Sequence, residues 1–397
     1  MSLVRLVIGL CLLCISGCVL TGQGSVRDTR AGEETIHGLW ITRWDYQKPE
    51  HVRQAIDDAA SIGITDVYWQ VRGQADAYYP SSYEPWGIEL TKYNPDPPSF
   101  DPLQIAINQS KKHNIKIHAW VNVMPMWRGK VPPADRTHMY HSHPEWRLRD
   151  ENGQVQQLHD GYVVVNPVLT EVQDHIVQVI RELVDRYEID GIHLDYIRYL
   201  SDEIKTEHLI PGDPVSRSLY AKQTGGSALA SEIDRIKYKN WIRDRITTLV
   251  ERIDRESIKR HRNVTLSAAV WRRPDLASQR YLQDAADWAN DGTVDVILPM
   301  IYTEKHDQYK SDLAAWNAVV KQSDIVPGLG VYKHTLPSET SHQIALGQPK
   351  RFALFAYSTL FESPNPDQPK DPASIALRTK HRDSMRDLIT RVGDTGG

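Results

Sequence analysis

One segment near the middle of the chain ends in a carboxylate of the kind that catalyses hydrolysis. Residues 190–198 read Asp-Gly-Ile-His-Leu-Asp-Tyr-Ile-Arg, which predicts a turn followed by a buried strand. If that strand belongs to a parallel barrel, Asp195 at its carboxyl end points into the mouth where such barrels hold their active sites. His193 shares this face with Asp195, because side chains alternate along a strand. We therefore expect Asp195 to be catalytic.

Polar and aromatic residues also stand at the ends of other strand-like segments. Tryptophan and tyrosine offer a flat apolar face and a polar group, which suits sugar rings, and the chain has 11 Trp and 18 Tyr but 4 Phe. The residues expected to bind substrate are Trp44, Asp45, Arg72, His118, Trp120, Asn122, His193, Trp271, Tyr302 and Tyr332. Filling of a large core is the alternative explanation for most of the aromatic residues.

Carboxylates among aromatic rings predict glycoside hydrolysis. That reaction needs one carboxylic acid to protonate the leaving oxygen and a second carboxylate to attack the sugar or activate water. We assign Asp195 as the nucleophile or base. For the acid we prefer Glu304, which follows Tyr302, over Asp45 and Glu362. In the competing interpretation Glu304 is a solvated loop residue, and Asp195 caps a helix or pairs with Arg198.

The elements that position these residues alternate regularly. Strands are predicted at residues 37–45, 66–72, 116–123, 191–198, 265–271, 295–302, 325–332 and 351–360. Helices are predicted at residues 49–62, 102–113, 170–187, 233–261, 279–290, 308–321, 338–346 and 371–391. Eight strand–helix pairs predict a single (β/α)8 TIM barrel. A doubly wound sheet is the alternative, disfavoured by the count of eight and by the lack of a Gly-rich phosphate loop.

Two connections are long, residues 124–169 after the third strand and 200–232 after the fourth. Long loops without regular structure are usually functional in compact domains. Both connections leave the carboxyl ends of their strands. We therefore expect them to form walls of the barrel mouth.

The amino terminus reads as a targeting segment. Arg5 precedes an apolar run at residues 6–15, too short to span a bilayer, and Ile15-Ser16-Gly17-Cys18 resembles a bacterial lipobox. This predicts a signal peptide at residues 1–18 with lipid on Cys18, a tether at 19–35, the barrel at 36–392 and a tail at 393–397. Val19, rather than Asp, favours the outer membrane by resemblance to Gram-negative sorting. An ordinary signal peptide or anchor is the alternative.

Composition restricts the partners. The net charge of −4 shows no basic stripe, so nucleic acid is not an expected partner. Loss of Cys11 and Cys14 with the signal and lipidation of Cys18 would leave no free thiol, hence no disulfide and no cysteine metal site. We expect a polysaccharide substrate, no metal and no cofactor, and the sequence does not predict an oligomeric state.

Seven short segments along the mature chain form a recognisable set. They begin at His37, Val67, Asp101, His118, Asp190, Pro299 and Gly328 and read His-Gly-Leu-Trp, Val-Tyr-Trp-Gln-Val-Arg, Asp-Pro-Leu, His-Ala-Trp-Val-Asn, Asp-Gly-Ile-His-Leu-Asp, Pro-Met-Ile-Tyr and Gly-Leu-Gly-Val-Tyr. Together they resemble the glycosyl hydrolase-like 10 family of bacterial TIM barrels. This family includes an envelope lipoprotein that cleaves peptidoglycan glycan strands, so the resemblance implies a barrel with glycosidase activity.

The chain departs from the family pattern at three positions. The family often has a second acid where Tyr196 stands, a Gln at Met300 and a Trp at Thr303. Chitinase-like barrels carry their catalytic Glu at the position of Ile197, so chitinase chemistry is not expected. In α-amylase-like barrels the Asp that corresponds to Asp195 of this chain is the nucleophile. This comparison favours a retaining mechanism.

Three functions are therefore consistent with the sequence. The first is an envelope glycosidase, and the second is a non-catalytic glycan-binding lipoprotein, motivated by the missing second acid at Tyr196. The third is a metal-dependent hydrolase that uses His118, His193 and Asp195, since histidine is a common metal ligand. The His-x-His and His-x-x-x-His pairs of many metal hydrolases are missing from these strand ends.

Overall fold

The computed structural model describes residues 34–92, 96–199, 210–261 and 263–394. The chain divides into two units, residues 1–33 and residues 34–397, and all described residues belong to the second. The predicted signal peptide, Cys18 and nearly all of the tether lie outside the described residues, as does most of the predicted tail.

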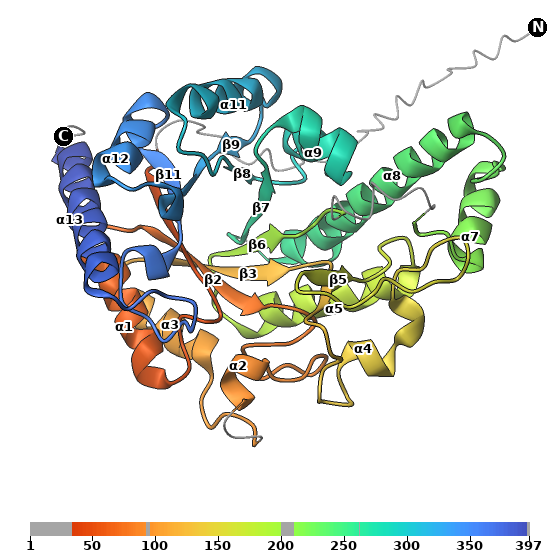
Figure 1. The fold of residues 1–397 in the computed structure, drawn as a ribbon, viewed down its shortest axis with the longest axis horizontal. Helices are drawn as coiled ribbons and strands as arrows, with labels where there is room; N and C mark the ends of the chain where they lie inside the picture. The colour runs from red at the N-terminus through yellow and green to blue at the C-terminus, as the bar shows by residue number, and fades with distance from the viewer. Residues whose placement is uncertain (1–33, 93–95, 200–209, 262, 395–397) are drawn as a thin grey trace, which may run out of the picture. The chain divides into compact units, whose positions relative to one another are not determined.

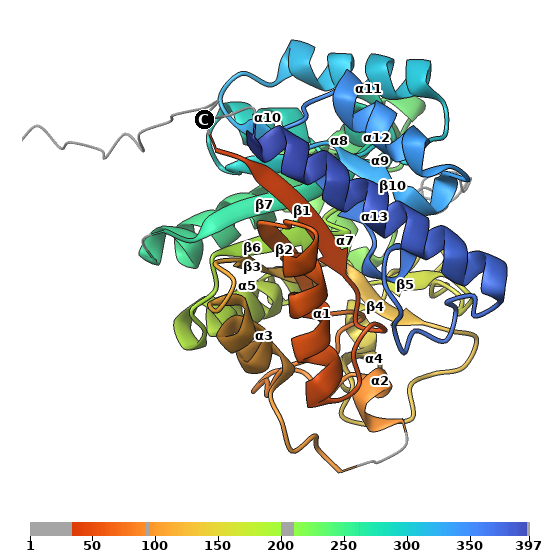
Figure 2. The same ribbon diagram turned by 90° about the vertical axis from the view of Figure 1, so that its left-hand side faces the viewer.

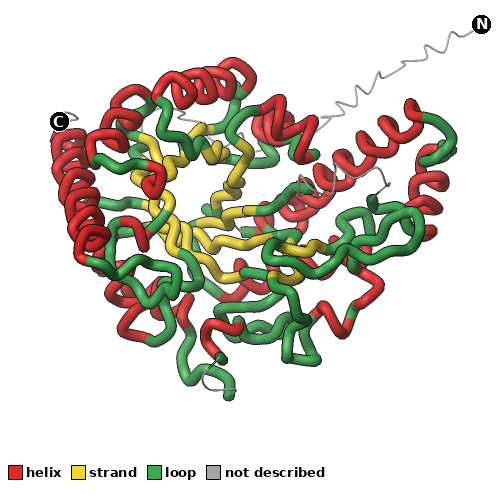
Figure 3. The backbone as a smooth tube through the Cα atoms, viewed as in Figure 1, coloured by secondary structure: helices red, strands yellow, loops and turns green. Residues whose placement is uncertain are grey.

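Eight parallel strands form a closed barrel, which confirms the predicted fold (Figures 1 and 3). Neighbouring strands pair in chain order, and β8 pairs with β10 at Met300 and Gly328 to close the ring. The strands are β1 (Ile36–Ile41), β2 (Asp66–Arg72), β3 (Lys116–Asn122), β6 (Gly191–Asp195), β7 (Thr265–Trp271), β8 (Val296–Met300), β10 (Gly328–Gly330) and β11 (Arg351–Phe355).

The seventh barrel strand is interrupted. We predicted one strand over residues 325–332, but the structure has a two-residue β9 (Asp324–Ile325) and then β10. Val326 N–H still bonds to Ile297 O at 3.0 Å, whereas the next residue, Pro327, has no N–H to donate. The proline therefore breaks the ladder, and Tyr332 falls in the short helix η3 (Val331–Lys333) rather than in a strand.

Helices surround the barrel (Figure 3), and α1 and α13 cover β1 on the side seen in Figure 2. Proline at the first turn starts several of them, where its missing N–H costs nothing. The helices of the outer layer are α1 (Pro49–Ser61), α3 (Pro102–Ser110), α5 (Thr170–Arg186), α8 (Glu232–Glu256), α9 (Pro274–Tyr281), α10 (Ala285–Asn290), α11 (His306–Val319), α12 (Pro337–Leu346) and α13 (Pro372–Asp394), with short turns η2 (Ile258–Arg260) and η4 (Tyr357–Thr359).

The single helix predicted over residues 279–290 is wrong, because two helices, α9 and α10, occupy this region. Leu282 between them has a left-handed φ of 53°. Gln283 follows and reaches back to β7, where its side chain accepts a 2.9 Å bond from Trp271 N and donates one of 3.1 Å to Ala269 O. The break therefore ties this connection to the carboxyl end of β7.

Two apolar layers follow from the alternation of side chains along each strand. Trp40, Tyr68 and Trp120 belong to a cluster inside the barrel. Their strand neighbours Leu39 and Val67 belong to the larger cluster between barrel and helices. Residues at the carboxyl ends of the inward-facing rows are thus directed at the barrel mouth.

The long connections carry structure of their own. The one after β3 holds β4 (Pro125–Arg128), α4 (Met139–Ser142), η1 (Pro144–Trp146) and β5 (Tyr162–Val164). β4 and β5 form an antiparallel ribbon. α2 (Ile88–Thr91) lies between β2 and α3, and α7 (Pro214–Thr224) follows β6. Among the described helices, none is long and apolar enough to cross a bilayer.

Candidate active site

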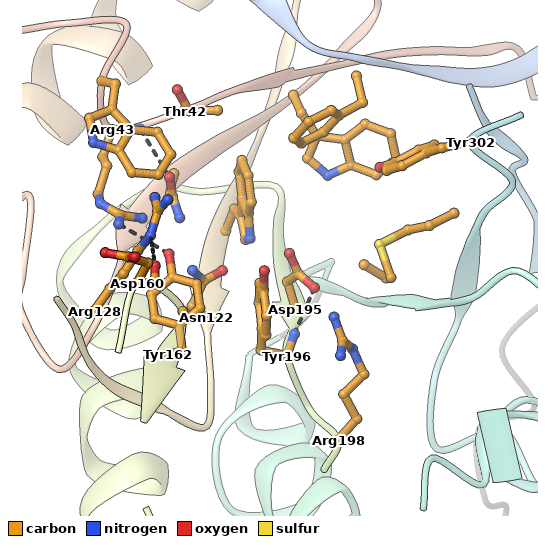
Figure 4. A pocket seen from close by; sticks show the side chains of 18 residues that line it. Thr42, Arg43, Asn122, Arg128, Asp160, Tyr162, Asp195, Tyr196, Arg198 and Tyr302 are labelled. Atoms are coloured by element: carbon orange, nitrogen blue, oxygen red, sulfur yellow. Dashed lines mark hydrogen bonds between the residues drawn. The ribbon is translucent and has the colours of Figure 1, made fainter. Parts of the chain in front are cut away.

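A pocket of about 400 Å³ opens at the carboxyl ends of the barrel strands. Its lining comes from β1, β2, β3, β6, β7, β8 and β11, together with the β4–β5 ribbon (Figure 4). Barrel enzymes hold their active sites at this end. The residues that line it are Trp40, Thr42, Arg43, Trp44, Gln70, Trp120, Asn122, Arg128, Asp160, Gly161, Tyr162, Asp195, Tyr196, Arg198, Ala269, Met300, Tyr302 and Phe355.

Aromatic rings from three strands and from the segment after β8 meet in this pocket. Phe355 stacks on Tyr302 with 5.3 Å between ring centroids. Its edge contacts Trp40 at 6.0 Å and Trp120 at 6.5 Å. Such a surface can stack against the C–H face of a sugar while the indole and phenol groups bind hydroxyls.

Asp195 ends β6 and is only 6 % exposed. The N–H of Tyr196 donates a 2.6 Å hydrogen bond to its Oδ1. Burial raises the pKa of Asp195 above its ordinary value, against the opposing effects of the Arg198 charge, the Tyr196 N–H and the Trp120 indole. The carboxyl therefore keeps its proton to a higher pH than a solvated aspartate does.

Three guanidinium groups share the pocket with Asp195 (Figure 4). Arg43 bonds to Glu89 at 3.3 Å and to Tyr162 Oη at 3.1 Å, and its buried Nη1 has no hydrogen-bond partner among the described residues. Arg198 lies over the Tyr196 ring at 4.5 Å, and its buried Nε also has no described partner. With Arg128 at the rim, the pocket can bind a negatively charged substituent.

Asp160 is the second carboxylate of the lining, and it lies on the same side of the pocket as Arg128 and Tyr162 (Figure 4). Its exposed carboxylate accepts a 2.8 Å bond from Lys130. That bond lowers the pKa of Asp160 below its ordinary value. The pocket thus holds two carboxyl groups whose surroundings move their pKa values in opposite directions.

Five of the residues predicted from the sequence line the pocket. They are Trp44, Trp120, Asn122, Asp195 and Tyr302. Trp44 stands under the Arg43 guanidinium at 3.9 Å. Asn122 donates a 3.0 Å bond to Gly73 O, and its Oδ1 has no described partner.

Two predicted histidines lie in the barrel interior and outside the lining. His193 is fully buried, accepts a 3.0 Å bond from Trp40 Nε1 and contacts Ser267 Oγ at 2.9 Å. His118 Nε2 pairs with Asp66 at 3.0 Å. The structure thus uses both rings to fill and hydrogen-bond the core below the pocket. Within the described ranges, no three His, Cys, Asp or Glu side chains gather as a metal site.

Other predicted residues support the pocket from outside. Arg72 forms a buried two-point ion pair with Glu84 and donates a 3.0 Å bond to Val123 O at the end of β3. Asp45 accepts bonds of 2.8 and 2.7 Å from the N–H and hydroxyl of Thr42. Arg72 therefore holds the chain at the end of β3, next to Asn122 of the pocket. Asp45 holds Thr42, which follows β1 and itself lines the pocket.

The remaining three lie around the rim or away from it. The ring of Trp271 lies tilted by 33° against that of Tyr281, with 4.0 Å between the centroids. The ring of half-exposed Tyr332 meets that of Tyr302 edge-on at 6.1 Å. Glu304, the preferred acid, is exposed and is not among the lining residues. The structure therefore does not bring Glu304 together with Asp195 in the pocket.

Sequence reasoning missed several lining residues. Trp40 on β1 and Thr42 just beyond its end stand at every second position before Trp44, so the two-residue period could have identified them. Phe355 was hidden because the eighth strand was expected to continue to residue 360, whereas β11 ends at Phe355. Arg43, Tyr162 and Asp160 carry no pattern that marks them.

Comparison with known proteins places the chain among sugar hydrolases. The model of the glycosyl hydrolase-like 10 family matches residues 35–343. Glycosyl hydrolase DigH of Escherichia coli K12 is 28% identical over 359 residues, which cover 78% of this chain and 76% of that protein. Glycosyl hydrolase YngK of Bacillus subtilis is 29% identical over 273 residues, 64% of this chain. The match spans about half, 49%, of the length of YngK.

Solved structures share the fold. The glycoside hydrolase domain of PgaB (BpsB) from Bordetella bronchiseptica superposes with a TM-score of 0.62 at 12% identity, over 90% of this chain and 98% of that domain. A β-galactosidase from the psychrophilic Marinomonas ef1 also gives 0.62, at 10% identity, over 90% of this chain and 60% of that one.

Proposed function

Because this chain belongs to the glycosyl hydrolase-like 10 family, we propose that it is a glycosidase that cleaves glycan strands of peptidoglycan or a related envelope polysaccharide. The observation that carries the proposal is Asp195, a buried carboxyl group at the end of a barrel strand and beside a surface of aromatic rings. Most glycoside hydrolases use a pair of carboxyl groups beside the scissile bond, and a carboxyl group held in this way can serve as one of the pair.

The opposed pKa shifts suggest roles for the two carboxyl groups. Asp195, whose pKa is raised by burial, suits the acid that protonates the leaving oxygen as the bond from that oxygen to the anomeric carbon breaks. Asp160, whose pKa is lowered, suits the carboxylate that takes a proton from the attacking water. These roles replace the sequence expectation, in which Asp195 was the nucleophile or base and Glu304 the acid.

The cations of the pocket support the choice of peptidoglycan. Its muramic acid residues carry a lactyl group, which ends in a free carboxylate wherever the stem peptide has been removed. Arg43 Nη1 and Arg198 Nε are buried at the pocket without a described partner, and a guanidinium group binds a carboxylate well. A neutral polysaccharide would leave these donors without a matching group.

The experiment compares the chain from residue 19 onward with its Asp195→Asn variant. Both are incubated with purified peptidoglycan, intact and stripped of stem peptides, and released fragments are read by mass spectrometry. We expect sugar fragments from the wild type and at least about 10³-fold fewer from the variant, since the acid is replaced by a group that cannot donate its proton. Equal release from both proteins would contradict the role of Asp195.

A non-catalytic glycan-binding protein is the second candidate. It is favoured by the exposure of Asp160 and by the position of Glu304 outside the lining. Binding of stripped peptidoglycan by the wild type without any fragment after long incubation would establish this function instead.

We also propose that the protein works in the cell envelope, held by lipid on Cys18. The support is the charge, apolar run and small residues before Cys18 in the sequence. Cell fractionation of the Cys18→Ala variant tests the proposal. The variant should leave the membrane fraction, and its continued presence there would refute lipid anchoring.

A further inference from the structure

A second groove, of about 610 Å³, lies beside the candidate active site. It is bordered by β4, α2 and the start of α4, which lie together in Figure 2. Adjacent residues of β4 separate the two cavities, since Arg128 lines the pocket and Trp127 lines the groove. None of the roles assigned above uses this groove.

Two indole rings form its apolar surface. Trp127 is held firmly, because its Nε1 donates a 2.8 Å bond to Val131 O and its ring meets His138 edge-on at 5.3 Å. Trp86 is only half-buried, and Ile88 beside it is 41 % exposed. A ligand ring that enters the groove can therefore stack on the accessible face of Trp86 without any rearrangement of the core.

The groove also contains a carboxylate with an unused oxygen. Asp76 is 2 % exposed, and its Oδ1 accepts bonds from Gly73 N at 3.2 Å and Gln74 N at 2.9 Å. Its buried Oδ2 accepts none from the described part of the chain. Aromatic faces beside carboxylate oxygens match a sugar, whose C–H face stacks while its hydroxyls donate hydrogen bonds.

The turn at residues 73–76 contacts both cavities. Gly73 O accepts a 3.0 Å bond from Asn122 of the pocket. Gln74 Oε1 accepts a 3.0 Å bond from Arg128 N, and Gln74 O one of 3.0 Å from His138 of the groove. The two sites are thus built on one rigid connection.

We propose that this groove binds a second stretch of the polysaccharide that is cut in the pocket, with a sugar ring on Trp86 and its hydroxyls at Asp76. The proposal rests on the proposed function for the identity of the polymer. It predicts that a long glycan binds more tightly than a short one, because only a long chain reaches both sites.

The test uses the full chain with Trp86→Ala, and Tyr83→Ala as the matched control, since Tyr83 is an exposed aromatic residue outside the groove. Binding to peptidoglycan stripped of stem peptides is measured by co-sedimentation in an Asp195→Asn background. Cleavage of the same material and of a short soluble oligomer obtained from it by partial hydrolysis, which carries the same lactyl carboxylates, is measured with Asp195 intact. Thermal denaturation checks folding, and Asp76→Asn, which keeps an acceptor for the turn, serves as the second variant.

We expect Trp86→Ala to bind the polymer about five- to tenfold more weakly than Tyr83→Ala, the loss that one stacked ring predicts. Polymer cleavage should fall while cleavage of the short oligomer is unchanged. Polymer binding and cleavage equal to those of the control in both Trp86→Ala and Asp76→Asn would overturn the groove proposal and leave the proposed function intact. If Trp86→Ala binds the polymer more weakly than Tyr83→Ala but the wild type cuts nothing, the result would support the groove and overturn the glycosidase. A wild type that neither binds nor cuts the polymer would overturn both.

Discussion

The backbone N–H of Tyr196 donates a 2.6 Å hydrogen bond to Oδ1 of Asp195, the residue directly before it. Tyr196 adopts a left-handed φ of 50° in making this contact, a conformation that costs a bulky residue of order 1–3 kcal/mol. Asp195 O accepts a 2.8 Å bond from Val123 N, so β3 holds the other side of the turn. The strained backbone therefore stands beside the buried carboxyl group of the pocket lining, and the hydrogen bond from Tyr196 N–H holds the Asp195 side chain in its orientation.

Arg198 should set the pH range of activity through Asp195. Its positive charge lowers the pKa of Asp195 against the larger rise from burial. If Asp195 is the acid, its loss of a proton sets the alkaline limb of kcat/KM. Arg198→Gln should move that limb upward by about one pH unit, since the charge that favours the carboxylate is lost.

Arg198→Lys is the control, because it retains the charge and should leave the limb nearly in place. Profiles of kcat/KM against pH for the three proteins provide the measurement. A limb that stays fixed, or moves to lower pH, in Arg198→Gln would show that Asp195 is not the titrating acid.

Asp160 and Glu304 give opposite predictions. Asp160 lines the pocket, whereas Glu304 is exposed outside the lining. Asp160→Asn should lower kcat on stripped peptidoglycan by about 10²-fold or more, the usual effect of losing a positioned base. Glu304→Gln should stay within about twofold of wild type. The reverse order of these two rates would restore the role that the sequence suggested for Glu304.

The sequence predicted those parts of the site that obey the alternation of a strand. Asp195, Trp120 and Asn122 stand on inward-facing rows of β3 and β6, and the bounds of β2 and β7 match the prediction. The same rule did not reveal how deep a residue lies along its row. His193 was expected one layer below Asp195 and in contact with substrate, but it lies outside the pocket lining, where it bonds to Trp40 and contacts Ser267.

The other errors come from contacts distant in sequence. Glu304 is close to Tyr302 along the chain, but only the path of the loop decides whether its side chain enters the pocket. Asp160 belongs to a long connection whose β4–β5 ribbon folds back over the barrel mouth. No periodicity in that segment indicates the return, so the second carboxylate could not be found from residue types and spacing.

Asp45 should make the stability of the barrel depend on pH. Burial raises its pKa to about 6, against hydrogen bonds from Thr42 that lower it. An unfolded aspartate loses its proton near pH 4, so the stability that protonated Asp45 provides is complete below about pH 4. It is lost as the pH rises to about 6, and the change amounts to about 2–3 kcal/mol.

Asp45→Asn does not titrate in this range and isolates the effect from other buried acids. The free energy of unfolding in urea, measured for both proteins at pH 4 and pH 7, should fall further in the wild type than in the variant. Parallel changes in the two proteins would mean that Asp45 is not held with a raised pKa.

Gly191 starts β6, and the absence of its side chain allows His118 to fit inside the barrel. A Cβ at position 191 would stand 2.2 Å from His118 Nδ1 and 2.9 Å from the backbone oxygen of Thr265. His118 is held by Asp66 at 3.0 Å and cannot turn away without breaking that pair. Gly191→Ala should therefore destabilise the fold by about 1–3 kcal/mol, the typical cost of overpacking.

The double variant Gly191→Ala/His118→Ala separates this clash from a general intolerance of alanine in β6. Removal of the ring eliminates the shorter contact, so the added cost of Gly191→Ala should be smaller in the His118→Ala background than in the wild type. Urea denaturation of the four proteins gives the coupling energy. Because Gly191 and Asp195 belong to the same short strand, the single variant should also lose activity, even under conditions where it remains folded. Full activity in a destabilised Gly191→Ala protein would show that the packing below Asp195 does not control its position.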